Sequence, residues 1–327
     1  MRYVYRKIIF YVVALWVAIT LNFAIPRMMP GNPAETIFAS HAQQLQSNPH
    51  ALDAIKAALG LSNDPILLQY WHYLVNLAHF DFGISFSAFP TQVSTIILQS
   101  LPWTLFLVGI ASILAWVLGT GFGILTAWRR GGVLDSTLPG LTIFTHSLPN
   151  FWLGLILLYV LAFLLGWFPT SHAYDVGLQP GLNLHFIGSV LYHAILPALT
   201  LIIVTVGGWL LGMRNVMINT LAEDYITMAQ AKGLSDRRVM FGYAARNALL
   251  PQITGLAMSL GFLVGGQVLI EDVFSYPGVG YVLANAVGQE DYPLIQALLL
   301  IIVVCMLVAN FAVDLLYARL DPRVRTT

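Results

Sequence analysis

The sequence predicts an all-α integral membrane protein with six transmembrane helices and both termini in the cytosol. Three observations support this class: an apolar composition, six apolar segments of spanning length, and basic residues that fall on one side. Hydrophobic residues make up 58% of the 327 residues and charged residues only 9%, with a mean hydropathy of +0.76. A soluble domain carries about 25% charged residues, so this composition indicates a membrane protein.

Six apolar segments are long enough to cross the hydrocarbon core of a bilayer, which takes about 20 helical residues. The first segment lacks a small-residue cleavage site, which favours an uncleaved anchor over a signal peptide. The third contains Pro149 and is expected to kink or break there, because proline interrupts the helical hydrogen bonds. The segments are residues 8–25, 103–127, 138–165, 195–213, 253–270 and 294–316.

These segments divide the chain into three parts. Residues 1–25 form an N-terminal transmembrane helix, residues 26–101 an extracytoplasmic region, and residues 102–327 a core domain with the other five spans. Residues 67–79 predict a short surface helix. The sequence does not decide whether the extracytoplasmic region as a whole folds as a cap over the pore. Its aromatic side chains favour an interfacial belt over a peptide-stacking site. They are Tyr70, Trp71, Tyr73, Phe80 and Phe82.

The basic residues set the orientation. When both termini are placed in the cytosol, only Arg27 and Lys56 of the 15 Lys and Arg residues fall outside. Cytoplasmic loops of membrane proteins carry an excess of Lys and Arg, so the loop at residues 214–251 is predicted to be cytosolic. The basic residues on that side are Arg2, Arg6, Lys7, Arg129, Arg130, Arg214, Lys232, Arg237, Arg238, Arg246, Arg319, Arg323 and Arg325.

The loop at residues 214–251 is the most polar and most basic stretch of the C-terminal half. Thr220 and Glu223 form a T-x-x-E capping box, which predicts that a helix begins near Leu221. Gly233 stands where a left-handed residue commonly ends a helix. The sequence therefore predicts a short helix that ends at this glycine.

A second short helix follows in the same loop. Ser235 is a candidate N-cap, and Pro251 disfavours the helical conformation for Leu250, so the helix is expected to end before the proline. Two short helices that are joined at a glycine and project from a membrane are typical of a docking element.

The predicted spans contain few ionisable groups. His146 is the one titratable side chain that the sequence places deep in a span, and an ion-coupled transporter usually needs acidic or histidine relays there. His146 and Ser147 are adjacent, so they point about 100° apart on a helix and form no catalytic dyad. No catalytic or metal-binding residue is predicted. Cys305 lies in an apolar run and is interpreted as a small hydrophobic residue.

Three G-x-x-x-G pairs occur in or next to the spans. Such pairs let helices approach closely, and we interpret them as packing sites within this chain rather than as a subunit interface. The pairs are Gly119 with Gly123, Gly208 with Gly212, and Gly261 with Gly265.

The loop sequence EDYITMAQAKGLSDRRV…RNALLP resembles the signature loop of membrane subunits of bacterial ABC importers. It is most similar to the dipeptide/oligopeptide (nickel) permease family, first-permease type. Four further blocks agree over nearly the whole chain: MPGNP at 29–33, the D-x-G-x-S pattern at 81–85, HSLPNFWLGLILL at 146–158 with WFP at 167–169, and EDVFSYPGVGYVL at 271–283. One departure is that Thr227, Met228 and Ala229 replace the Glu-Ala-Ala that begins the general importer loop.

The resemblance implies an ABC type I importer permease fold in the bacterial cytoplasmic membrane. It implies four partners besides the lipid bilayer: a second homologous permease, two cytosolic ATPases and an extracytoplasmic substrate-binding protein, with no nucleic acid. ATP and magnesium would bind to the ATPases, and this chain would be neither an enzyme nor a cofactor protein. The sequence has no G-x-x-x-x-G-K-[ST] phosphate loop.

The resemblance also assigns candidate residues. Expected contacts to an ATPase are Glu223, Tyr225, Ala229, Lys232, Gly233, Leu234 and Arg237. Candidates for the pore lining are Asn150, Ser259, Gln267 and Asn285. Glu271 and Asp272 are expected at the outer mouth, where a solvated helix end is favoured over contact with a cationic substrate or the delivery protein.

The cargo implied by the resemblance is a di- or oligopeptide. Oligosaccharides and nickel chelates remain alternatives within the same family. A more distant alternative is an ion-coupled secondary transporter, and a non-transporting receptor or an intramembrane enzyme is a further one.

Overall fold

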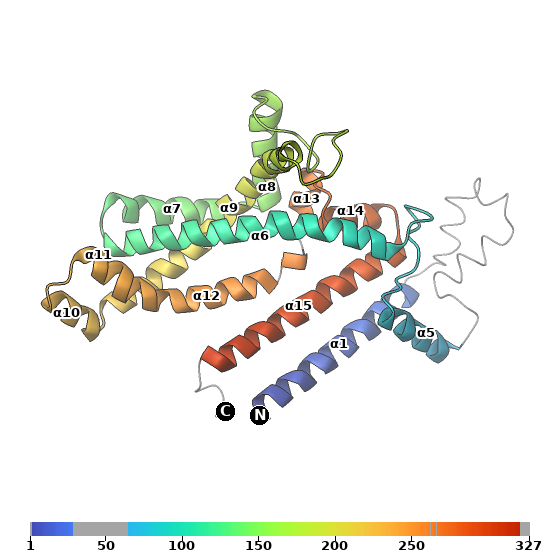
Figure 1. The fold of residues 1–327 in the computed structure, drawn as a ribbon, viewed down its shortest axis with the longest axis horizontal. Coiled ribbons are helices and arrows are strands. Elements are labelled where there is room, and N and C mark those ends of the chain that lie inside the picture. The colour runs from blue at the N-terminus through green and yellow to red at the C-terminus, as the bar shows by residue number, and fades with distance from the viewer. Residues whose placement is uncertain (1, 29–64, 262, 266, 321–327) are drawn as a thin grey trace. The chain divides into compact units, whose positions relative to one another are not determined.

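In the part of the chain that it describes, the computed structural model is built from helices joined by irregular segments, the longest of which are residues 79–92 and 165–183 (Figure 1). One bridged pair, Ile84 with Gln92, joins two short extended stretches, and no strand occurs in the described ranges. The all-α class is therefore confirmed. The structure describes residues 2–28, 65–261, 263–265 and 267–320. Residues 29–64 of the predicted extracytoplasmic region, with the motif at 29–33 and Lys56, lie outside these ranges.

The chain forms two compact units, which we call the terminal unit and the middle unit. The terminal unit comprises Met1–Pro102 and Gly278–Thr327, and the middle unit comprises Trp103–Pro277. The terminal unit thus combines both ends of the chain. The predicted division, with residues 102–327 as one core domain, stays a prediction.

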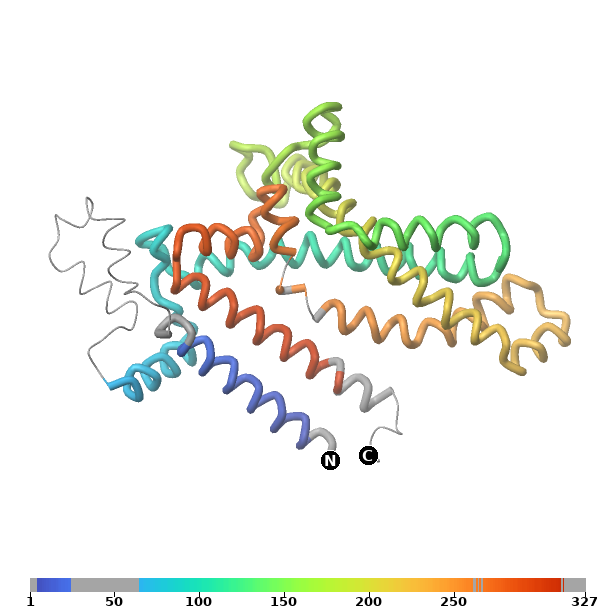
Figure 2. The backbone as a smooth tube through the Cα atoms, turned by 180° about the vertical axis from the view of Figure 1, so that it is seen from behind, coloured from blue at the N-terminus to red at the C-terminus, as the bar shows by residue number. Residues whose placement is uncertain are grey.

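In the terminal unit, α1 (Arg2–Met28) packs antiparallel to α15 (Tyr292–Leu320), as Figure 2 shows. Near one end, Nζ of Lys7 and the hydroxyl of Tyr11 each lie 2.7 Å from Oδ2 of Asp314. Near the other end, Nδ2 of Asn22 donates to the carbonyl oxygen of Gln296 (2.8 Å). Polar contacts therefore hold both ends of this helix pair. The unit also contains α5 (Ile66–Ala78), α14 (Val279–Gly288) and the first turns of α6 (Val93–Trp128).

The D-x-G-x-S segment folds around a buried carboxylate in the same unit. Oδ1 of Asp81 accepts from the backbone N–H of Gly83, and the hydroxyl groups of Ser85 and Ser87 donate to Oδ2 of Asp291. Ser85 and Asp291 are fully buried. Asp291 also accepts from the backbone N–H of Leu294 in the first turn of α15. The motif therefore fixes the segment before α6 to the start of α15.

The middle unit is built around α9, which packs against α6, α7, α8 and α12. Gly119 and Gly123 of α6 lie against α9 so closely that a Cβ at Gly119 would be 2.5 Å from Cβ of Trp209. This confirms packing within the chain for that pair, whereas a Cβ at Gly208 would meet nothing within 4 Å. The elements are α6 (Val93–Trp128), α7 (Val133–Ser147), α8 (Asn150–Leu157), η1 (Leu158–Leu164), α9 (Leu184–Leu221), α10 (Asp224–Ala231), α11 (Asp236–Arg238), η2 (Val239–Ala245), α12 (Arg246–Gly261), η3 (Leu263–Gly265) and α13 (Val268–Val273).

Within the described ranges, four helices are long and apolar enough to cross a membrane, namely α1, α6, α9 and α15, and they confirm four of the predicted spans. The third predicted span is a bent pair, Val133–Ser147 and Asn150–Leu164, with an angle of 97°. The bend confirms the break expected at Pro149. Leu148, the residue before the proline, is extended (φ −79°, ψ 135°), as proline disfavours the helical conformation there. The total of six spans stays a prediction.

The predicted fifth span, residues 253–270, is wrong as a continuous helix. α12 ends at Gly261, the short η3 follows, and α13 begins at Val268. Glycine destabilises helix interiors, and this stretch contains Gly261, Gly265 and Gly266.

The expected helix end before Pro251 is also wrong, because α12 continues through that proline. The buried Ala248, Gln252 and Thr254 show that packing overrides the local preference there.

Candidate functional site

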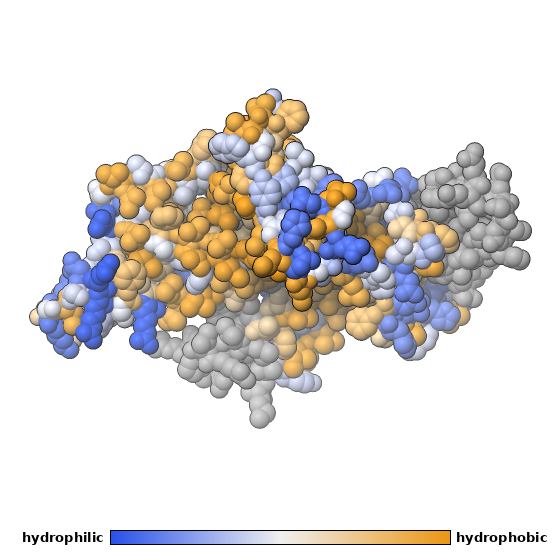
Figure 3. Space-filling view, turned by 45° about the horizontal axis from the view of Figure 1, so that its top comes forward, coloured by the Kyte–Doolittle hydropathy of each residue, from blue (hydrophilic) through white to orange (hydrophobic). Residues whose placement is uncertain are grey.

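The candidate site is the segment from Glu223 to Arg238, which contains α10, Gly233 and α11. Figure 3 shows hydrophilic residues gathered at the end of the middle unit that carries this segment, beside a largely hydrophobic surface. α9 has 38 residues, almost twice the roughly 20 that are needed to cross a bilayer, and is therefore roughly 57 Å long. One continuous helix therefore joins the apolar part of the unit to α10.

The predicted start of α10 is wrong. α9 continues to Leu221, and the hydroxyl of Thr220 donates to the carbonyl oxygen of Val216, one turn earlier in the same helix (2.9 Å). Glu223 is the residue before α10, and its side chain makes no capping hydrogen bond. The T-x-x-E pattern thus spans the end of one helix and the start of the next, and it forms no capping box.

The predicted glycine stop at Gly233 is confirmed. Its φ is +71°, its N–H donates to the carbonyl oxygen of Gln230 (2.8 Å), and the N–H of Leu234 donates to that of Ala229 (3.4 Å). These two bonds form a Schellman motif, which satisfies carbonyl groups at a helix end. α11 then begins directly after Ser235, whose side chain makes no capping bond. The chain therefore reverses sharply between α10 and α11.

α10 is anchored by two buried side chains. Ile226 is 1% exposed and Ala229 is 3% exposed, and both belong to an apolar cluster with Met213 and Met217 of α9 and Val239 of η2. Ile124 and Ala127 from the end of α6 complete this side of the cluster. Close packing of this kind fixes α10 against the ends of α6 and α9.

The opposite face of α10 is exposed. Tyr225 and Met228 are 37% and 60% exposed, and Lys232 lies on the same face. Met228 is absent from the predicted contacts, although its spacing of three and four residues from Tyr225 and Lys232 indicates a shared face. The hydroxyl of Tyr225 accepts from Nδ2 of Asn247 (2.9 Å), which orients its ring.

The other predicted contacts separate by burial. Glu223, Gly233 and Arg237 are exposed, whereas Leu234 is half-buried. Ala229 points into the apolar cluster, so it anchors α10 and presents no surface to a partner. The alternation of buried and exposed positions along α10 accounts for this correction.

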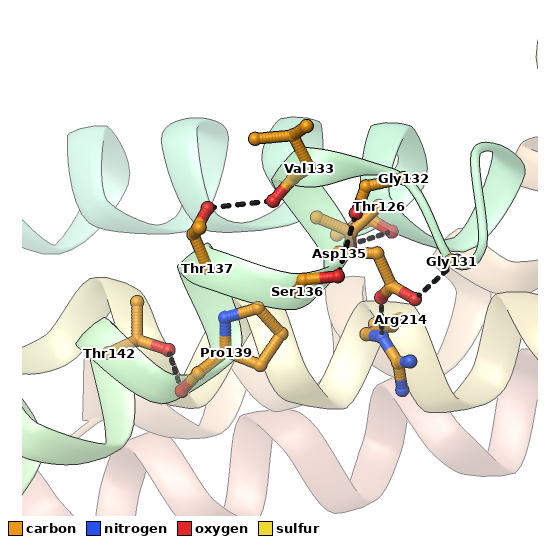
Figure 4. A network of polar contacts seen from close by, with 11 residues as sticks. Thr126, Gly131, Gly132, Val133, Asp135, Ser136, Thr137, Pro139, Thr142 and Arg214 are labelled. Atoms are coloured by element: carbon orange, nitrogen blue, oxygen red, sulfur yellow. Dashed lines mark hydrogen bonds and ion pairs between the residues drawn. The ribbon is translucent and has the colours of Figure 1, made fainter.

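An ion pair braces the same end of the unit. Nε of Arg214 in α9 lies 2.6 Å from Oδ1 of Asp135 in the first turn of α7, and Oδ2 of Asp135 accepts from the backbone N–H of Gly131 (Figure 4). The contact joins the turn between α6 and α7 to the part of α9 that leads into α10. Three helices therefore meet at the base of the candidate segment.

Two predicted pore residues lie together at the helix breaks of the middle unit. Nδ2 of Asn150, the first residue of α8, donates to Oε1 of Gln267, the residue before α13 (2.8 Å). α13 packs on α8 beside this pair, where a Cβ at Gly154 would lie 3.4 Å from Ile270 and Phe274 side-chain atoms. The glycine permits this close approach.

The other two predicted pore residues bond within their own helices. The hydroxyl of Ser259 donates to the carbonyl oxygen of Leu256 (2.8 Å), and Nδ2 of Asn285 donates to that of Tyr281 (2.8 Å). Asn285 lies in the terminal unit, and the other three residues lie in the middle unit.

The predicted solvated position of Glu271 is wrong. Its side chain is fully buried, and Oε1 accepts from the hydroxyl of Thr104 in α6 (2.8 Å). A buried carboxylate requires such donors because desolvation is otherwise costly. Asp272, the next residue, is exposed as expected.

His146 makes a structural contact. Its Nδ1 lies 3.0 Å from the carbonyl oxygen of Val204 in α9, within hydrogen-bonding distance. Among the described residues, no group of three or more His, Cys, Asp and Glu side chains is placed to hold a metal ion.

Comparisons with known proteins identify the family. Residues 119–326 match the family described as binding-protein-dependent transport system inner membrane component, and residues 1–108 match the N-terminal region of such membrane components. The chain belongs to this family. It is a permease component of a bacterial inner-membrane transport system.

Several curated relatives match over almost their full length. The oligopeptide transport system permease protein AppB of Bacillus subtilis is 36% identical over 323 residues, which is 98% of each chain. The di/tripeptide transport system permease protein DppB of Pseudomonas aeruginosa is 34% identical over 93% of each chain. The glutathione transport system permease protein GsiC of Escherichia coli K12 is 31% identical over 99% of each chain.

Proposed function

We propose that this permease is one of two membrane subunits of an ATP-driven importer for di- and oligopeptides. An extracytoplasmic binding protein delivers the peptide, and two cytosolic ATPases supply the energy. The names of the relatives, which refer to peptides and to glutathione, support the cargo class. ATP and magnesium bind to the ATPases, and this chain supplies the path and the coupling element.

The proposed topology has six spans with both termini in the cytosol. α12, η3 and α13 then act together as one broken span. The described basic side chains of the middle unit support this orientation, because Arg129 and Arg130 follow α6 and Lys232 and Arg237 lie in the α10–α11 segment. The cluster that contains Ile124 and Ile226 brings these two regions to the same end of the unit.

The observation that carries the mechanism is the two-sided nature of α10. Its inner face is buried against α6, α9 and η2, while its outer face, with Tyr225 and Met228, is exposed. An ATPase that holds the outer face and changes its position on ATP binding will move α10 and, through the buried face, the long helices. Rigid-body motion of packed helices is an established way to switch between two states.

The test is ATP hydrolysis by the purified complex in lipid nanodiscs, with the binding protein added with and without peptide. We expect hydrolysis that increases with loaded binding protein. Gly233→Pro will abolish this increase, because proline cannot adopt a φ of +71° and lacks the N–H that donates to Gln230. Arg237→Glu will weaken it by charge reversal at an exposed position.

Arg129→Glu is the matched control, because Arg129 is exposed near the same end of the unit but lies outside the α10–α11 segment. It is expected to hydrolyse ATP like the wild type. A complex that contains no ATPase, or Gly233→Pro transport at the wild-type rate, would contradict the coupling role. Transport that stops when an ion gradient collapses and continues without nucleotide would support the secondary-transporter alternative.

A further inference from the structure

We propose that Asn150 and Gln267 form a contact for the main chain of the transported peptide. The inference rests on the proposed peptide cargo and adds the chemical group that the path recognises. The starting observation is the hydrogen bond between the two side-chain amides, which lie 117 residues apart in the sequence.

The amide pair lies where two helical segments break. The bent pair of α7 and α8 has 15 residues in α7 before the break at Leu148 and Pro149, and α8 with η1 extends to residue 164 after it. The second break is marked by the short η3 (Leu263–Gly265), which lies between α12 and α13. Inside a membrane, irregular backbone is tolerated only where protein buries it or where it lines a water-filled cavity. The pair is half-buried, which matches a site at the edge of such a cavity.

The hydrogen-bonding inventory of the pair is incomplete. An amide side chain has one acceptor oxygen and an NH2 group with two donors. After Asn150 donates to Gln267, Oδ1 of Asn150 and Nε2 of Gln267 have no hydrogen-bond partner among the described residues. If the donor and acceptor roles were exchanged, the pair would still retain one acceptor and one NH2 group. An apolar environment penalises polar groups without partners, so a ligand that offers one N–H and one C=O to this half-buried acceptor and donor would be stabilised there.

An extended peptide carries the matching groups. One residue of an extended chain directs its N–H and its C=O to the same edge, and the two residues of a hydrogen-bonded pair in an antiparallel ladder exchange both bonds. Oδ1 of Asn150 can accept a hydrogen bond from the N–H of such a peptide residue, and Nε2 of Gln267 can donate one to its C=O. Main-chain bonds of this kind give affinity that is independent of the side chains, which suits a path for peptides of variable sequence.

The experiment compares trialanine with two analogues that carry an N-methyl group on the second or the third residue. Each analogue lacks one main-chain N–H. Transport is measured in nanodisc-derived proteoliposomes with saturating loaded binding protein, after the affinity of the binding protein for each peptide has been determined separately. For the wild type, we expect about 3- to 10-fold slower transport of at least one analogue, as the loss of one hydrogen bond implies.

The double variant Asn150→Leu/Gln267→Leu is expected to transport trialanine about 3- to 10-fold more slowly and to lose the discrimination between the peptides. The exchanged variant Asn150→Gln/Gln267→Asn keeps both amides and is expected to keep the discrimination. Gln296→Leu is the matched control, because Gln296 is also a half-buried amide, and its Nε2 donates to the carbonyl oxygen of Asn22 at the contact between α1 and α15. Folded yield and ATP hydrolysis are measured for every variant.

The outcomes separate the two proposals. If the wild type moves no peptide, the cargo assignment and this inference are both wrong. If the wild type moves trialanine and the Leu double variant still discriminates against the same analogue, only the inference is wrong. Loss of discrimination in Gln296→Leu to the same extent as in the double variant would also overturn it.

Discussion

Ile226→Ala tests whether α10 transmits motion through its buried face. Ile226 is 1% exposed and packs with Met213, Met217 and Val239, so its truncation leaves a cavity in the cluster. Substitutions of buried isoleucine by alanine cost about 2–5 kcal/mol. Since Ile226 and Ala229 are the buried side chains of α10, this loss falls mainly on the attachment of that helix. A loss of about 2 kcal/mol increases the open population of α10 by about 30-fold.

Hydrogen–deuterium exchange of the complex in nanodiscs measures this population. We expect backbone amides of Asp224–Ala231 to exchange about 30-fold faster in Ile226→Ala, with unchanged exchange in the apolar part of α9, and fewer peptides transported per ATP. Leu250→Ala is the control, because Leu250 lies in α12, outside the α10–α11 segment, and a 59% exposed side chain contributes about 0.5 kcal/mol or less to stability. Unchanged exchange in α10, or normal transport despite faster exchange, would refute the argument.

Three further predictions concern single residues. Gly119→Ala places a Cβ at 2.5 Å from the facing helix, so we expect a loss of about 1–3 kcal/mol in thermal unfolding, whereas Gly121→Ala, with open space around it, is neutral or stabilising. Gly233→Ala is expected to lower stability by about 1 kcal/mol through backbone strain alone, because alanine disfavours a φ of +71° while no atom lies within 4 Å of the new Cβ. Hydrogen–deuterium exchange should then be faster only at the end of α10. Asp135→Asn removes the ion pair with Arg214, and its melting temperature is expected to stay below that of the wild type at both about 0.1 M and about 1 M salt, because a partly buried pair is only weakly screened.

Local chemistry made part of the fold predictable. Proline acts on the residue before it, so the break at Pro149 follows from the sequence alone. Gly233 likewise ends α10 because a left-handed residue after a helix favours glycine. The long apolar runs gave the four helices that are long enough to span a membrane, since their signal extends over many residues.

The errors come from contacts between distant residues and from competition between neighbouring helices. The burial of Glu271 depends on Thr104, which is 167 residues away and carries no sequence pattern that links the two. The start of α10 was misplaced because the longer α9 keeps Thr220 in its own hydrogen-bond ladder. Pro251 fails to end α12 because buried neighbours such as Ala248 hold the helix together.

The candidate site was partly predictable for the same reason. Helical periodicity identifies the two faces of α10, and its consistent use would have placed Met228 outside and Ala229 inside. The hydrogen bond between Asn150 and Gln267 could not be derived, because the relative rotation of α8 and α13 decides it.

The pairing of α1 with α15 has a consequence for biosynthesis. Tyr11 and Asp314 are 303 residues apart, so α1 enters the bilayer long before its partner leaves the ribosome. At about 5–20 residues per second, the delay is roughly 15–60 s. Site-directed cross-linking between Tyr11 and Asp314 in stalled nascent chains should therefore appear only once α15 has emerged. During that interval Asp314, the partner of Lys7, and Gln296, the partner of Asn22, have not yet been synthesised or inserted, and α1 must persist in lipid without α15.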